Sequence, residues 1–140
     1  MEKGLMYYMN GNLQMAKLST KHLIEISPDE KMRASLLEDL HALEKFESNM
    51  LYIKGTEKVK PLSNMSQMNT EMAIDMKTLM NKSPEKLASM LTAGYEKGIS
   101  SISENIRRHA DAPEDEKELA KGYLTFMKQC LAKYKGMEMQ

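Results

Sequence analysis

The sequence predicts an all-α protein, an up-down bundle of about five helices that forms a single domain over residues 1–140. Three observations predict this class. Apolar residues recur every three or four positions along nearly the whole chain, which is the spacing of amphipathic helices. The alternation of apolar and polar residues that is typical of β-strands is almost absent. Serine, proline and acidic residues mark helix starts at several places along the chain.

The first two helices are expected over residues 3–26 and 29–54. Between them, Ser27 and Pro28 supply an N-cap and a first-turn proline for the second helix, and acidic residues follow. Because this joint is short, the two helices are expected to form an antiparallel hairpin, residues 3–54. The second helix carries a continuous apolar stripe made of Met32, Leu36, Leu40, Leu43, Phe46, Met50 and Ile53.

The remaining helices are expected over residues 63–81, 84–109 and 114–135. A longer loop with glycine and proline precedes the helix 63–81, whereas short joints precede the last two helices, with Pro84 at the first position of one helix and Pro113 just before the other. The last two helices are therefore expected to form a second antiparallel hairpin, residues 84–135, and 63–81 is the helix that connects the two hairpins.

Both hairpins resemble a known family. The first has a Ser-Pro-Asp-Glu joint at residues 27–30 and, on its second helix, Glu38 followed three positions later by His41. In these features and in its Ala and Leu spacing it resembles ferritin-like helical bundle domains, in particular the small rubrerythrin-like and spore-coat-type members. The hairpin from Leu87 to Tyr134 is similar in shape to their second hairpin. The resemblance implies a ferritin-like bundle and, in metal-bearing members, a di-iron site of Glu and Glu-x-x-His ligands.

The metal ligands of that family are not matched along this chain. At about 100° per residue, Glu38 and His41 lie away from the apolar stripe of their helix and are expected to face solvent. Gln14 stands where the first helix would supply a glutamate, and the last helix has no Glu-x-x-His at the corresponding place. We therefore expect no bound cofactor, and an iron site built on Glu38 and His41 is an alternative.

Methionine is concentrated in the connecting helix. The chain has 15 methionines, and Met65, Met68, Met72 and Met76 share one face of helix 63–81. Because the methionine side chain is flexible and polarisable, such a row suits a core or an adaptable docking surface. Thioether sulfurs also bind Cu(I), so a copper site is the further alternative for this row.

Three residues of helix 84–109 are candidates for an interaction surface or a pocket. Gly94 and Gly98 lie four positions apart on the face that is expected to meet the core. Because glycine destabilises a helix interior by up to about 1 kcal/mol, we expect another helix to approach closely there, or a small ligand pocket to open. His109 lies on the apolar side near the C-terminus, where the helix dipole favours an imidazolium.

Two further side chains lie on or beside apolar stripes. Asp39 flanks the stripe of the second helix, and we expect it to stay solvated at the edge of the core. The alternatives are a pairing with a lysine or a tyrosine hydroxyl, because an inward carboxylate needs a partner, and a place in a ligand cavity. Cys130 lies on the apolar stripe of the last helix. With no histidine near it in sequence, it is expected to act as a small buried hydrophobe.

Composition argues against several functions. Twenty basic and twenty acidic residues leave no net charge, so the chain lacks the basic surplus that nucleic-acid binding needs. A single cysteine supports neither a disulfide framework nor a cysteine-rich metal site. No apolar run has the length of a membrane span, and the N-terminus lacks a secretory pattern. We therefore expect a soluble, cytoplasmic protein that binds neither nucleic acid nor membrane.

No motif in the sequence brings catalytic groups together, so we expect a protein that is not an enzyme. The leading expectation is an interaction or scaffold protein that self-associates as a homodimer, or binds another protein, because a chain of this size leaves apolar helix faces to cover. The alternatives are a metal-binding protein, of the di-iron type or the methionine-based copper type, and a carrier of a small apolar ligand.

Overall fold

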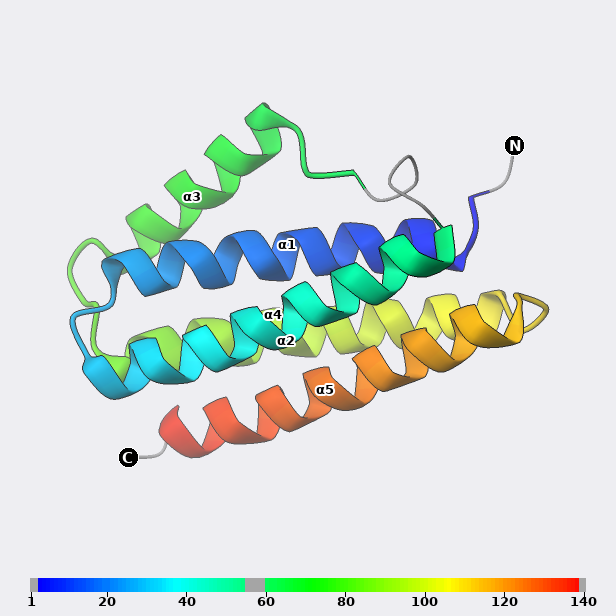
Figure 1. Ribbon diagram of the computed structural model, residues 1–140. Helices are drawn as coiled ribbons and strands as arrows, with labels where there is room; N and C mark the ends of the chain where they lie inside the picture. The colour runs from blue at the N-terminus through cyan, green and yellow to red at the C-terminus, as the bar shows by residue number, and fades with distance from the viewer. Residues whose placement is uncertain (1–2, 55–59, 139–140) are drawn as a thin grey trace.

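A computed structural model of the chain describes residues 3–54 and 60–138. Within these residues all regular structure is helical and no strand occurs. Five helices follow one another: α1 (Leu5–Ile26), α2 (Glu30–Lys54), α3 (Asn64–Thr78), α4 (Pro84–Arg108) and α5 (Glu114–Glu138) (Figure 1). The prediction of an all-α chain with five helices is confirmed.

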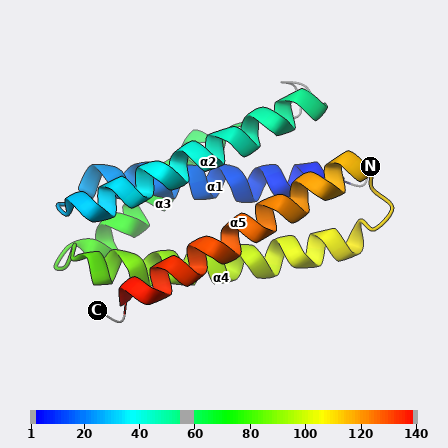
Figure 2. The ribbon, with the colours of Figure 1, turned by 60° about the horizontal axis from the view of Figure 1, so that its bottom comes forward.

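The four long helices form a bundle of two antiparallel hairpins. α1 packs against α2 and α4 packs against α5, while α1 also lies beside α4 and α2 beside α5 (Figure 2). α2 and α4 run in the same direction, because α3 returns the chain along the bundle between them (Figure 1). Each long helix therefore has two antiparallel neighbours. α3 lies outside this bundle and packs against α1.

Side-chain caps begin the helices where the sequence marks their starts. The Ser83 hydroxyl accepts a hydrogen bond from the backbone N–H of Lys86 at 3.2 Å. At the start of α2 the Asp29 carboxylate accepts from the N–H of Met32 at 2.8 Å, so the cap is Asp29 and not Ser27, which ends α1. Each cap satisfies an N–H that the first turn leaves free, and is worth about 1 kcal/mol.

The core lies between the four long helices. Its largest fully buried side chains all come from them: Leu5, Met9, Leu13, Met32, Leu36, Leu43, Met50, Leu87, Ile102, Tyr123, Met127 and Tyr134. Full burial of one such aliphatic side chain contributes about 1.5–3 kcal/mol. Within α3, Ile74 is the one buried apolar residue, so α3 adds little to this core.

A charged group lies inside the bundle where α2 meets α5. Asp39 is 4% exposed, and its carboxylate accepts hydrogen bonds from Lys133 Nζ at 2.7 Å and from the Tyr134 hydroxyl. The Tyr134 hydroxyl also lies 3.1 Å from the Ser35 hydroxyl. The expectation that Asp39 stays solvated at the edge of the core is wrong, and the structure shows the alternative, a pairing with lysine and tyrosine. These partners compensate the cost of burying a carboxylate and join α2 to α5.

We expect Asp39→Asn to destabilise the protein, because Lys133 and Tyr134 both lose a charged acceptor. The free energy of unfolding in urea should fall by about 1–3 kcal/mol. Glu38→Gln is the matched control, since Glu38 is exposed on the same helix and its replacement should change stability by less than about 0.5 kcal/mol. Equal stability of the two variants would contradict a structural role for the Asp39 pairing.

Candidate functional site

α3 is attached to the bundle mainly by polar contacts. On α1, His22 Nε2 lies 2.7 Å from Asp75 Oδ1, and His22 Nδ1 lies 3.4 Å from Glu71 Oε2. Ile74 and Thr78 are the buried residues of α3. Ion pairs that are partly open to solvent contribute only about 0–1 kcal/mol each. α3 is therefore held far less strongly than the four bundle helices hold one another.

The outer side of α3, with the two residues that follow it, is apolar and faces solvent. Six large side chains there are each 61–93% exposed: Met65, Met68, Met72, Met76, Leu79 and Met80. We call these six residues the methionine face. The alternative that the methionine row is core is wrong, because the four long helices fill the core without α3. The alternative of a docking surface agrees with this exposure.

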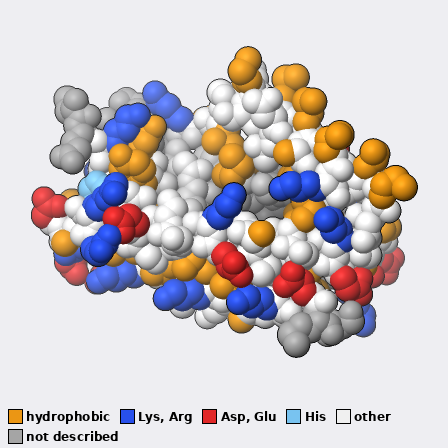
Figure 3. Space-filling model, turned by 180° about the vertical axis from the view of Figure 1, so that it is seen from behind, with side chains coloured by type: hydrophobic (Ala, Val, Ile, Leu, Met, Phe, Trp, Pro, Cys, Tyr) orange, Lys and Arg blue, Asp and Glu red, His pale blue; other side chains and the backbone are white. Residues whose placement is uncertain are grey.

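A groove of about 720 Å³ lies between α1, α4 and the C-terminal part of α3. Its apolar lining comes from these three helices, with Met15, Leu23, Ile74, Met90 and Leu91, and from Met127 of α5. Figure 3 shows this side of the molecule, with a hollow beneath the ridge of apolar side chains that α3 presents and basic side chains around it. The groove exists because α3 packs against α1 and leaves open the space between itself and α4.

Three lysines line this groove, and none of them was predicted to be a site residue from the sequence. Lys77 on α3 and Lys86 and Lys97 on α4 line the groove, and no acidic residue does. Positions 86, 90, 94 and 97 share one stripe of α4 at about 100° per residue, so a helical wheel shows two of these lysines beside Gly94. Lys77 lines the same groove only because α3 folds back beside α1. The amino-acid pattern within α3 does not indicate this orientation.

The two candidate glycines of α4 have different surroundings. A Cβ atom at Gly94 would have no heavy atom within 4 Å, whereas one at Gly98 would lie 3.2 Å from Met127 Sδ and 3.3 Å from Asn12 Nδ2. The Asn12 amide also donates to the Gly98 carbonyl at 3.2 Å. The predicted close approach is confirmed at Gly98. Gly94 does not face the core, and its missing side chain leaves room in the groove.

The other predicted site residues, Glu38, His41 and His109, do not line the groove. Glu38 and His41 are exposed on α2. His109 caps α4, with Nδ1 2.8 Å from the Asn105 carbonyl oxygen and Nε2 3.1 Å from the Lys3 carbonyl oxygen. In the part of the chain that the structure describes, no three histidine, cysteine or acidic side chains gather as metal ligands. Cu(I) binding by the methionines stays an alternative.

A cysteine and two tyrosines lie near Asp39 inside the bundle. Burial, with a smaller effect of the Asp39 charge, raises the pKa of the Cys130 thiol to about 12, so at neutral pH it is an unreactive thiol. Burial also raises the pKa of the Tyr95 and Tyr134 hydroxyls, whose rings stack with centroids 6.2 Å apart. The expectation that Cys130 is a small buried hydrophobe is confirmed, since it is 3% exposed.

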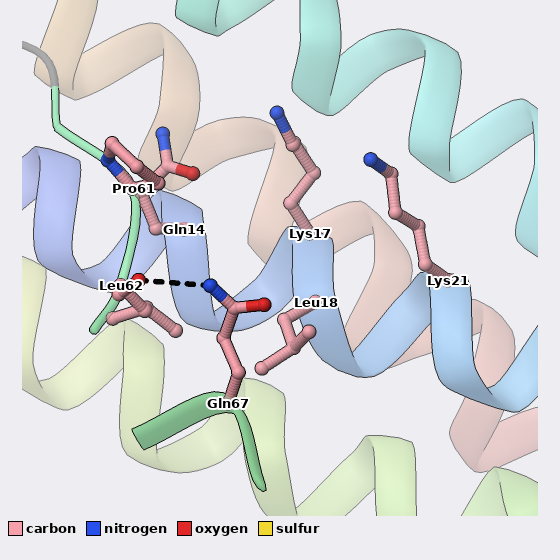
Figure 4. Close-up of a pocket in the computed structure, with 7 residues that line it drawn as sticks. All are labelled: Gln14, Lys17, Leu18, Lys21, Pro61, Leu62 and Gln67. Carbon is pink, nitrogen blue, oxygen red and sulfur yellow. Dashed lines mark hydrogen bonds between the residues drawn. The ribbon is translucent and has the colours of Figure 1, made fainter. Parts of the chain in front are cut away.

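A smaller cavity of about 210 Å³ lies between α1 and the segment that leads into α3 (Figure 4). The Gln67 amide donates to the Leu62 carbonyl at 2.8 Å, as the dashed line in Figure 4 marks. Lys17 points away from Gln67 in that view and bonds to Glu47 of α2 at 2.9 Å. The polar groups of Lys17 and Gln67 are thus bonded within the protein and are not free to hold a ligand.

Comparison with known proteins identifies no relative: no protein-family model matches the chain, and no curated protein or solved structure matches it. Among the described residues, no helix has both the length and the apolar character to cross a membrane. The methionine face and the groove, both next to α3, are thus the two surfaces from which function is inferred.

We expect Gly94→Ala to stabilise the protein more than Gly98→Ala does. Both changes remove a helical glycine, which favours folding by about 0.5–1 kcal/mol. At Gly98 the new methyl group presses on Met127 and Asn12, and this contact offsets the gain. Urea unfolding of the two variants measures the difference. Equal gains would contradict close packing of α1 on α4 at Gly98.

Proposed function

We propose that this protein is a non-catalytic interaction protein that self-associates through the methionine face. Six large apolar side chains lie in solvent there, on a helix that the bundle does not need to complete its core. Contiguous apolar surface of this kind on a soluble protein marks an interaction site. Flexible methionine side chains suit a surface that adjusts to the one it packs against.

A second copy of the chain is the partner that we propose. The methionine face contains no charged side chain, so the surface that binds it is expected to be apolar and not oppositely charged. The same face on another copy supplies that surface, in a two-fold arrangement where each face buries the other. Twenty basic and twenty acidic residues leave the chain without net charge, so two copies are not held apart by repulsion.

The order of the helices supports a ferritin-like outline, which we include in the proposal. Two antiparallel hairpins joined by one long crossover is the topology of ferritin-like bundles, and α3 lies in the crossover of this chain (Figure 1). On this proposal the chain keeps the outline of that family and uses its connecting segment for association. We keep the cytoplasm as its proposed location, where a lone cysteine stays reduced.

We expect the double variant Met68→Glu/Met72→Glu to lose self-association, because it places charges in the centre of the buried face. Sedimentation velocity should show a dimer for the native protein at high micromolar concentration and a monomer for the variant. Circular dichroism should show unchanged helix content, since Met68 and Met72 are 62% and 61% exposed in the single chain.

Leu37→Glu is the matched control for this experiment. Leu37 is a large apolar residue, 44% exposed on α2, and it lies outside the methionine face, so its variant should still dimerise. A native protein that stays monomeric at every concentration would overturn self-association. A dimer that survives Met68→Glu/Met72→Glu would overturn the assignment to the methionine face.

A further inference from the structure

We propose that the groove between α1, α3 and α4 binds a fatty acid, with the alkyl tail along its apolar lining and the carboxylate between Lys77 and Lys86. This site is separate from the methionine face, which lies on the outer side of α3. The inference therefore goes beyond self-association and does not depend on it.

The size and lining of the groove fit a single alkyl chain. Its volume of about 720 Å³ lies within the range of about 300–1,000 Å³ of small-molecule sites. Met15, Leu23, Met90 and other apolar side chains line it, and Gly94 contributes no side chain that would fill it. Removing an alkyl tail from water against such a surface favours binding in proportion to the apolar area that is buried.

The charge around the groove selects an anionic head group. Lys77, Lys86 and Lys97 line it without any aspartate or glutamate, and none of the three forms an ion pair with another described residue. Lysines elsewhere in the bundle do pair with acids, as Lys54 does with Glu116 at 2.8 Å. The groove is thus a place of uncompensated positive charge in a chain with no net charge, and a carboxylate complements it.

The order of the lysines along the groove places the head group at one end. Lys77 and Lys86 stand on either side of the short connection between α3 and α4. Lys97 lies 11 residues after Lys86 on the same helix, which is about 16 Å at 1.5 Å per residue. The end near this connection therefore has two lysines from two helices, and the tail extends from there past Gly94.

A peptide fits this groove less well than a fatty acid. The walls are helices whose backbone groups bond internally, so an extended peptide in the groove would leave its own N–H and C=O groups unpaired. A helical peptide about 10 Å in diameter would fill 720 Å³ within about two turns. An alkyl chain needs no hydrogen-bond partner along its length, so these helical walls leave none of its groups unpaired.

Isothermal titration calorimetry with sodium dodecanoate tests the site on the full chain. We expect saturable binding of one dodecanoate per chain. Dodecyltrimethylammonium has the same tail and the opposite charge, and we expect it to bind at least about tenfold more weakly, since tenfold corresponds to about 1.4 kcal/mol. No saturable binding of dodecanoate, or equal affinity for the cationic amphiphile, would overturn the proposal.

Substitutions locate the two ends of the ligand. Lys77→Gln/Lys86→Gln should weaken dodecanoate binding by about tenfold or more, because it removes two charge-assisted contacts. The matched control is Lys121→Gln/Lys128→Gln, which changes the same number of exposed lysines on α5 and should leave affinity unchanged. Equal losses in both double variants would overturn the placement of the carboxylate.

Gly94→Leu tests the path of the tail. Its side chain should enter the groove without a clash, because no heavy atom lies within 4 Å of a Cβ at this position, so urea unfolding should show a folded protein. Dodecanoate binding should then be lost, and native-like affinity in this variant would overturn the assignment of the tail to the groove. Met68→Glu/Met72→Glu should bind dodecanoate as the native protein does, which separates this site from the dimer surface.

Discussion

The four long helices bury their apolar stripes against one another, and the placement of every other surface follows from that shared burial. Large side chains from both hairpins, such as Met9, Leu36 and Tyr123, are excluded from water together. Because these helices already bury one another's apolar stripes, no space is left for α3 in the core. It packs against α1 through polar contacts and Ile74. The exposed methionine face and the groove beside α4 are both consequences of α3 lying outside.

Polar contacts between the helices fix how the bundle aligns, since apolar stripes alone tolerate sliding. Asn12 donates to the Gly98 carbonyl and accepts from the Tyr123 hydroxyl at 2.6 Å, and so joins α1, α4 and α5. Asp39, with Lys133 and Tyr134, does the same for α2 and α5. Buried polar groups that lose such partners cost about 1–3 kcal/mol each, which disfavours shifted packings.

The sequence predicts what depends on local pattern. Periodicity and caps predict the helices, and glycine spacing predicts the close contact at Gly98. The burial of Asp39 is not predicted, because a position beside the apolar stripe also fits a solvated carboxylate. The orientation of α3 cannot be predicted from the sequence of α3 alone. A row of methionines shows that the helix has an apolar stripe, but not whether that stripe faces the core or the solvent. The groove is not predicted from the sequence either, since Lys77 and Lys86 line one groove only because α3 folds back along α1.

Methionine oxidation tests most directly whether α3 lies outside the core and presents an association surface. Brief peroxide treatment followed by peptide mass spectrometry reads each methionine separately, because solvent-exposed thioethers oxidise faster than buried ones. In dilute protein, Met65, Met68 and Met72 should oxidise fast and the core methionines Met9 and Met32 slowly; in concentrated protein the first three should become protected. Face methionines that are as slow as the core ones in dilute protein, or equally fast at both concentrations, would contradict this arrangement.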